Sequence, residues 1–176
     1  MTRVDRGALF ATVYALLDEP PHRFDCGRLC GRRCCDSGCA GESVEGMRLL
    51  PGEKQFLQSV APFAFIYKQS EDGDVLVCNG RCDRAVRPIP CRIFPYYAKI
   101  AEKAGRVDIL LRRDPRSLAV CPLVSESPYR PTPAFCGNFK RAMRLLIKDE
   151  EIADDVRKTS SFNESLLALY RKFDNL

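Results

Sequence analysis

Histidine is almost absent from this chain of 176 residues, in which His22 is the only one. A single imidazole leaves little room for the acid–base and nucleophilic chemistry in which histidine usually takes part. His22 stands beside Pro21 and has no evident partner residue, so we predict a surface residue rather than a ligand or a base. Enzymatic chemistry would then depend on a thiolate, an iron–sulfur centre or carboxylates that no motif singles out.

The common catalytic motifs are missing as well. The sequence contains no glycine-rich phosphate loop, no HExxH metalloprotease motif and no GxSxG nucleophile elbow. It also lacks the CxxxCxxC spacing of radical-SAM enzymes. These absences leave open whether the protein is an enzyme.

Long apolar runs are absent too, and no segment approaches the roughly 20 apolar residues that a membrane span requires. The N-terminal segment does not resemble a signal peptide, because Asp5, Arg6, Asp18 and Glu19 flank its apolar part. We therefore expect a cytoplasmic protein without a membrane partner. In that reducing compartment, cysteine-rich patterns indicate metal binding more often than disulfides.

The hydrophobic periodicity predicts one α+β domain over residues 1–176, with 45% hydrophobic residues to form a core. Helices are expected at 5–18, with Asp5 as the N-cap, and at 51–60. A small antiparallel sheet is expected from a hairpin of 63–69 and 74–79 and a third strand at 106–114. The C-terminal helices of 133–173 are predicted at 133–149, 150–158 and 163–173, the last two separated by the caps Thr159, Ser160 and Asn163.

Ten cysteines are the most informative feature of the chain. Residues 26–46 contain almost no large apolar side chain, so this loop cannot order itself around a hydrophobic core, whereas a bound metal could order it. The first cluster, CGRLCGRRCC, spaces Cys26, Cys30 and Cys34 by four residues, and CNGRC places Cys78 close to Cys82. Such short spacings allow one turn to present two sulfurs to one ion.

The adjacent pair Cys34–Cys35 indicates more than one sulfur-binding position. Neighbouring side chains diverge, so one small ion cannot easily take both. Two four-sulfur zinc sites fit this pattern, and so does one iron–sulfur cluster with spare thiols. Disulfides remain an alternative. Cys136 lies among apolar residues of a predicted helix, which favours a buried thiol, and Cys39 stays unassigned.

Arginines accompany the cysteines, and the formal net charge is +5. Eight thiolates holding two Zn²⁺ would reduce that charge to about +1, so the basic balance is weak evidence for any partner. Nearby cations stabilise thiolates, which explains the arginines at least as well as a phosphate-binding surface would. We do not expect nucleic acid as a partner. The arginines concerned are Arg28, Arg32, Arg33, Arg81, Arg84, Arg87 and Arg92.

Several of these segments resemble a known family. CGRLCGRRCC, GMRLLPGEK, CNGRCDRAVRPIPCRIFPYY and AVCPL, within residues 26–123, are similar to the zinc- or iron-chelating domain proteins known by their CxxCxxCC motif. The family pattern RPxxCRxFP is met by Arg87, Pro88, Cys91, Arg92, Phe94 and Pro95. The first spacing here is CxxxCxxxCC instead, which is closer to the cysteine run of flagellin lysine-N-methylases.

The resemblance implies metal chelation within 26–123 by eight thiolates, with zinc or iron as the metal. The implied ligands are Cys26, Cys30, Cys34, Cys35, Cys78, Cys82, Cys91 and Cys121, which leaves Cys39 and Cys136 as extras. Around Cys91 we expect supporting roles: Pro88 and Pro90 restrict the backbone, Arg92 donates to a thiolate or a backbone carbonyl, and Phe94 anchors the turn in the core.

Three functions follow from these features. The first is a cytoplasmic metal-binding protein of unassigned biochemical role. The second is an iron–sulfur or thiolate-dependent enzyme, related to methyl transfer through the CxxxCxxxCC spacing. The third is a zinc-dependent nucleic-acid-binding module, which the arginines suggest and which strong salt dependence would reveal.

Overall fold

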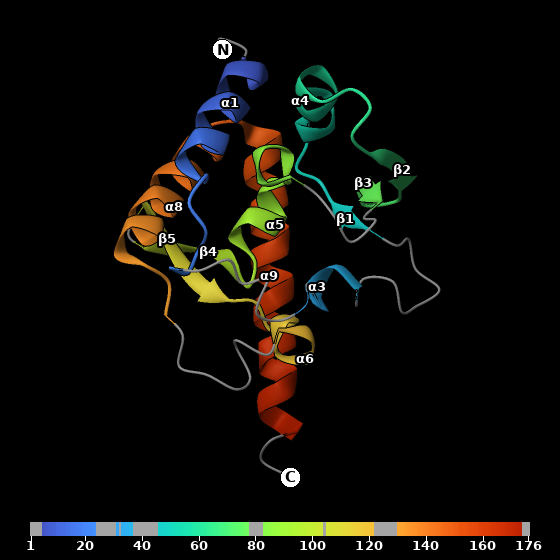
Figure 1. Ribbon diagram of the computed structural model, residues 1–176. Coiled ribbons are helices and arrows are strands. Elements are labelled where there is room, and N and C mark those ends of the chain that lie inside the picture. Colours follow the sequence, from blue (N-terminus) through green and yellow to red (C-terminus); the bar gives the residue numbers. More distant parts are fainter. Residues whose placement is uncertain are drawn as a thin grey trace.

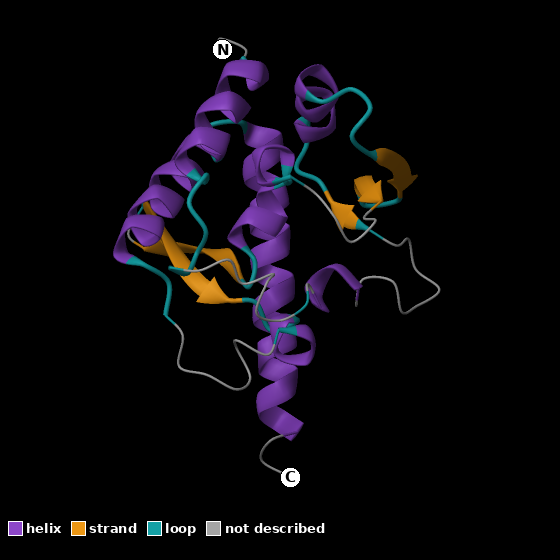
Figure 2. Cartoon of the chain, in the orientation of Figure 1, coloured by secondary structure: helices purple, strands orange, loops and turns teal. Residues whose placement is uncertain are grey.

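The computed structural model describes residues 5–23, 31, 33–36, 46–77, 83–103, 105–121 and 130–173. In this part of the chain, helices accompany two small antiparallel sheets, which confirms the predicted α+β class (Figure 2). Most of the cysteine-rich loop 26–46 lies outside the described residues, and its expected ordering by metal stays a prediction.

The N-terminal helix α1 (Arg6–Leu16) packs against α8 (Pro133–Leu146). The Asp5 carboxylate caps α1 by accepting hydrogen bonds from the backbone N–H groups of Gly7 at 3.0 Å and Ala8 at 3.2 Å. Thr132 caps α8 in the same way, accepting from the N–H of Phe135 at 3.1 Å. Both helices were predicted from the spacing of their apolar residues.

The first sheet has the strand order β1 (Met47–Arg48), β3 (Gly73–Val77), β2 (Ile66–Ser70). The predicted hairpin is confirmed, with Ser70 opposite Gly73 across its turn. The segment before β1 closely approaches β3 at Gly46, where φ is 153° and a Cβ atom would lie 2.2 Å from the Leu76 carbonyl oxygen. Only glycine fits at this position.

The second sheet is a hairpin of β4 (Tyr96–Lys103) and β5 (Arg106–Arg113), with Tyr96 opposite Arg113 at its open end. The predicted third strand is confirmed as β5, but it does not join the first sheet as expected: it pairs with β4, a strand that was not predicted, and forms a second sheet. Tyr96 joins the core beside Phe135 of α8, whereas Tyr97 donates to Glu164 at 2.5 Å. Successive side chains of β4 point to opposite faces of the sheet, so Tyr96 contacts α8 and Tyr97 contacts the C-terminal helix that carries Glu164.

The two helices predicted at 150–158 and 163–173 are one continuous helix, α9 (Glu150–Phe173). Thr159, Ser160 and Asn163 do not end it. Arg48 donates to the Thr159 hydroxyl at 2.9 Å, and the Ser160 hydroxyl accepts from the N–H of Ile100 at 3.2 Å. Asn163 is fully buried. The Thr159 and Ser160 side chains serve contacts between elements, and all three residues lie within the helix, so the predicted break is wrong.

Short helices complete the described fold: α3 (Arg33–Asp36), α4 (Glu53–Val60), the 3-10 turn η2 (Arg84–Val86), α5 (Ile89–Ile93) and α6 (Ser117–Val120). Figure 1 shows α9 along the length of the molecule, with α1, α8 and the β4–β5 hairpin on its left and α4 with the first sheet on its right. The core residues with no more than 1% exposure are Phe10, Val13, Leu17, Leu57, Ile89, Ile109, Phe135, Phe139, Ala142, Leu146 and Ile152.

Candidate metal centre

Cys91 lies on the short helix α5, which two prolines introduce. Pro88 is its N-cap and Pro90 stands in its first turn, so the backbone before Cys91 has little freedom to lose. The Cys91 side chain is half-buried. The predicted rigid presentation of this cysteine agrees with the observed helix.

Arg92, the next residue, is 1% exposed and holds the surroundings of Cys91 together. Its guanidinium donates to the Arg87 carbonyl at 2.7 Å, and to those of Arg84 at 2.5 Å and Ala85 at 2.9 Å. On the other side it donates to the carbonyls of Tyr14 at 3.3 Å and Leu17 at 3.2 Å. Of the two roles predicted for Arg92, the structure shows donation to backbone carbonyls.

Burial of this arginine lowers its pKa, and the neighbouring Tyr14 and Asp18 oppose that effect. The guanidinium carbon also lies 4.4 Å from the centroid of the Tyr14 ring. A fully buried cation is tolerated because carbonyl oxygens and an aromatic face replace water around it. Arg92 thereby joins the C-terminal end of α1 to residues 84–87, which follow Cys82 in the sequence.

Glu53 forms the second buried contact of this region. Its carboxylate accepts from the Tyr14 hydroxyl at 2.8 Å, and from the backbone N–H groups of Ile89 at 2.7 Å and Leu50 at 3.0 Å. Burial raises the pKa of Glu53, while these hydrogen bonds and Arg92 act in the opposite direction. Burial also raises the pKa of Tyr14. Glu53 therefore fixes the first residue of α5 to α1 and α4.

Cys121 follows α6 and is 7% exposed. Its N–H donates to the Ser117 carbonyl at 2.8 Å. Asp114, which lies between β5 and α6, connects this segment to the residue before β4, because its N–H donates to the Pro95 carbonyl at 2.9 Å. The segment that leads to Cys121 is thus hydrogen-bonded to the segment that follows Cys91.

Cys91 and Cys121 lie on the two segments that continue from the open end of the β4–β5 hairpin. Cys91 precedes β4 by a few residues and Cys121 follows β5 by a few, and the strand ends Tyr96 and Arg113 are paired. Helices α5 and α6 therefore both leave the same end of one hairpin. A predicted ligand lies on each of the two segments.

The CC pair lies on α3, which contacts α6 (Figure 1). The Cys34 side chain is exposed. The side chain of Cys35 lies outside the described part of the structure. Although more than 80 residues separate them in the sequence, the helices that carry Cys34 and lead into Cys121 are neighbours.

The remaining predicted ligands, Cys26, Cys30, Cys78 and Cys82, lie outside the described residues, as does Cys39. Among the side chains that are described, no group of three or more metal-binding residues is found. The eight-thiolate assignment as a whole therefore stays a prediction.

Three expectations near this site need correction. His22 is not at the surface: it is 3% exposed, and its ring lies 5.9 Å from that of Tyr96. Cys136 is half-buried rather than buried. Phe94 is half-buried and does not belong to the core, whereas the adjacent Pro95 is buried. The sequence offered no signal for the buried His22, because the burial results from the return of residues 130–132 beside it.

Burial raises the pKa of Tyr96 to about 12, and charge interactions with Cys136 and Cys121 act in the same direction. Both cysteines therefore influence Tyr96, although the family pattern includes only Cys121. Cys136 serves as a test of the ligand assignment because the pattern leaves it out.

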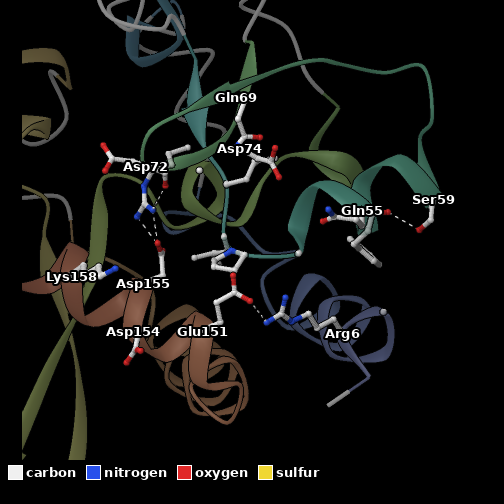
Figure 3. A pocket seen from close by; sticks show the side chains of 18 residues that line it. Arg6, Gln55, Ser59, Gln69, Asp72, Asp74, Glu151, Asp154, Asp155 and Lys158 are labelled. Atoms are coloured by element: carbon white, nitrogen blue, oxygen red, sulfur yellow. Dashed lines mark hydrogen bonds and ion pairs between the residues drawn. The ribbon is translucent and has the colours of Figure 1, made fainter. Parts of the chain in front are cut away.

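A cavity of about 720 Å³ lies elsewhere, between α1, α4, the first sheet and the N-terminal half of α9 (Figure 3). Ion pairs cross it: Arg6 donates to Glu151 at 2.6 Å, and Arg48 pairs with Asp155. No cysteine is among the described residues that line this cavity.

Comparison of the chain with protein-family models, with curated proteins and with solved structures finds no match. The similarity to the chelating family thus depends on the quoted motifs alone. Within the described residues, no helix has both the length and the apolar composition needed to cross a bilayer.

Proposed function

We propose that the protein binds metal through the thiolates of its cysteine-rich region, with zinc as the leading candidate and iron or an iron–sulfur cluster as the alternative. Its compartment is the reducing cytoplasm, and no reaction is assigned to it. The observation that carries this proposal is the placement of Cys91 and Cys121 on segments that leave one end of one hairpin, with the Cys34 helix beside α6.

The chemistry of these residues fits a thiolate centre. Cysteines are the ligands of structural zinc and of iron–sulfur clusters, and both require several sulfurs from separate segments. Half-buried Cys91 and buried Cys121 would supply ligands from segments that are hydrogen-bonded to the rest of the fold. Exposed Cys34 would supply one from the loop 26–46. A metal would connect that loop to the frame, and the bound ion would contribute folding free energy to it.

The RPxxCRxFP motif supports the same proposal. Two of its contacts are seen here: the Arg87 carbonyl accepts from Arg92, and Pro88 is the N-cap of the helix that carries Cys91. Such hydrogen bonds around a ligand orient it and raise metal affinity in known metalloproteins. We assign Arg92 and Glu53 to this positioning role rather than to metal contact.

The test compares Cys34→Ser with Cys136→Ser after anaerobic purification, with metal per chain as the readout. Cys34 is exposed, so its substitution leaves the hydrophobic core intact. We expect Cys34→Ser to lose about half of the metal, because an eight-thiolate set would form two four-sulfur sites. Cys136→Ser should keep all of it. Equal metal content in wild type and Cys34→Ser would refute the assignment, and metal loss in Cys136→Ser would show that the ligand set is wrong.

A further inference from the structure

The outer face of α8 carries a separate cluster of charge, which we call the α8 basic face. It consists of Lys140, Arg141, Arg144 and Lys148, all exposed. No aspartate or glutamate occurs between Pro133 and Lys148. Figure 1 shows α8 at the outer edge of the molecule, where it packs on α1 and β5. Four positive charges therefore project from one side of the fold.

These charges are not neutralised by their surroundings. Several cations elsewhere in the described chain are paired with carboxylates, for example Arg6 with Asp149, Lys54 with Asp74 and Arg157 with Asp154. No member of the α8 basic face has an ion pair with a described residue. The exposed positions of the neighbouring α1 between residues 7 and 15 are glycine, alanine and threonine, so they add no negative charge.

The helix dipole explains only part of the cluster. Cations stabilise the last turn of a helix, which accounts for Arg144 and for Lys148 just beyond the helix end. Lys140 and Arg141 lie farther toward the helix N-terminus, where this effect has fallen off. Lys140, Arg144 and Lys148 are each four residues apart, which corresponds to steps of about 6 Å along the helix direction.

The composition of this face distinguishes between polyanionic partners. A helix that binds a membrane surface inserts large apolar side chains beside its cations, and a protein interface is usually anchored by aromatic or apolar residues. The other exposed positions of α8 are Pro133, Ala134 and Gly137, which offer neither. Binding to a phosphate backbone requires only positive charge on an accessible surface. The absence of an exposed aromatic residue on α8 also argues against stacking on single-stranded bases.

We propose that the α8 basic face binds the phosphate backbone of double-stranded nucleic acid without sequence preference. This surface is distinct from the arginines that accompany the cysteines, whose charges are explained by compensation of the thiolates. It does not depend on the metal proposal, because no predicted ligand lies on α8.

The experiment measures binding of a short fluorescent duplex by anisotropy from about 50 to about 200 mM KCl, with the reduced, metal-replete full chain. Four phosphate contacts predict a slope of about −3 to −4 for log K against log salt, because each contributes about −0.9. K140Q/R144Q should weaken binding at least about tenfold and reduce the slope by about two. The matched control K68Q/K158Q removes two exposed lysines of other elements and should change the affinity less than twofold.

Three results would overturn the proposal: no salt-dependent binding, an equal loss in K140Q/R144Q and K68Q/K158Q, or tighter binding to vesicles of anionic lipid that K140Q/R144Q abolishes. All four substitutions are at exposed positions, so circular dichroism should confirm an unchanged fold. Metal content is measured on the same samples. It should be unchanged in every variant, which keeps this test separate from that of the metal centre.

Discussion

Replacement of Glu53 by leucine should destabilise the protein far more than a typical glutamate substitution, because this carboxylate is a buried acceptor for three donors. It accepts from the hydroxyl of Tyr14 and from the N–H groups of Leu50 and Ile89, and its exposed fraction is 0%. Leucine has a similar volume, so the change leaves no large cavity. The cost comes from donors that lose their acceptor.

Each buried donor left without a partner costs about 1–3 kcal/mol. Three such donors would cost several times that amount, and removal of a desolvated carboxylate recovers part of it. We therefore expect a loss of about 2–5 kcal/mol in the free energy of unfolding. Urea unfolding, followed by circular dichroism on metal-replete reduced protein, should show a midpoint lower by about 1–2 M.

A double-mutant cycle sharpens the test. Tyr14→Phe alone should cost about 1 kcal/mol, since it removes one hydrogen bond. In the Glu53→Leu background the same change should cost almost nothing, because the hydroxyl has already lost its acceptor. Glu71→Gln, at an exposed position of the β2–β3 turn, is the control and should be neutral. A loss below about 1 kcal/mol for Glu53→Leu, or strict additivity with Tyr14→Phe, would refute this account of the network.

Further predictions concern the positioning arginine, the metal and the ion pair at the start of α9. Arg92→Lys should lower the free energy of unfolding by about 2–4 kcal/mol and expose residues 84–87 to protease, because one ammonium cannot reach five carbonyls. Arg106→Lys, at an exposed position, is the control. Equal stability of both variants would contradict the carbonyl contacts. Metal removal under reducing conditions should leave most of the helical circular dichroism but open residues 26–46 to protease, since α1, α8 and α9 form their core without the loop. An unchanged cleavage pattern would show that the cysteines are not structural metal ligands. Asp149→Asn should cost about 1–2 kcal/mol at pH 7. Hydrogen bonding from Arg6 lowers the pKa of Asp149, so wild type should lose this advantage over Asp149→Asn as the pH falls below about 4, and a constant difference in urea midpoints down to pH 3 would contradict that coupling.

Much of the fold followed from local patterns. The spacing of Phe10, Val13 and Leu17 predicted α1, and the alternation around a short turn predicted the β2–β3 hairpin. Strand β4 was missed because YYAKIAEK contains alanine, lysine and glutamate, which have low strand propensity. Its stability comes from pairing with β5 and from contacts of Tyr96 and Tyr97 with distant helices. Such tertiary contacts are not visible in a window of local sequence.

The helix break predicted before Asn163 failed for a related reason. Threonine, serine and asparagine satisfy backbone groups at helix ends, but they can equally bond to other elements from within a helix. Thr159 accepts from Arg48 of β1, and Ser160 accepts from Ile100 of β4. Local sequence does not distinguish these two uses.

For the candidate site, the cysteine ligands implied by the family resemblance stay a prediction, and the hydrogen bonds around Cys91 and Cys121 were not predicted from the sequence. Glu53 lies within the helix predicted at 51–60, but its partners Tyr14 and Ile89 are more than 35 residues away on either side. Arg92 was expected to have either of two roles, and the carbonyls of α1 and η2 show which one it has. A charged residue between apolar neighbours, as in PCRIFP, is the one signal of burial that the sequence contained.

The most direct test of the central claim is metal analysis of anaerobically purified protein together with its absorption spectrum. We expect about two zinc ions per chain and a colourless solution, since eight thiolates suffice for two tetrahedral sites. A brown protein with iron and sulfide would support the same ligands with an iron–sulfur cluster. Protein that is folded, has all its thiols reduced and contains no stoichiometric metal would contradict the proposed metal centre.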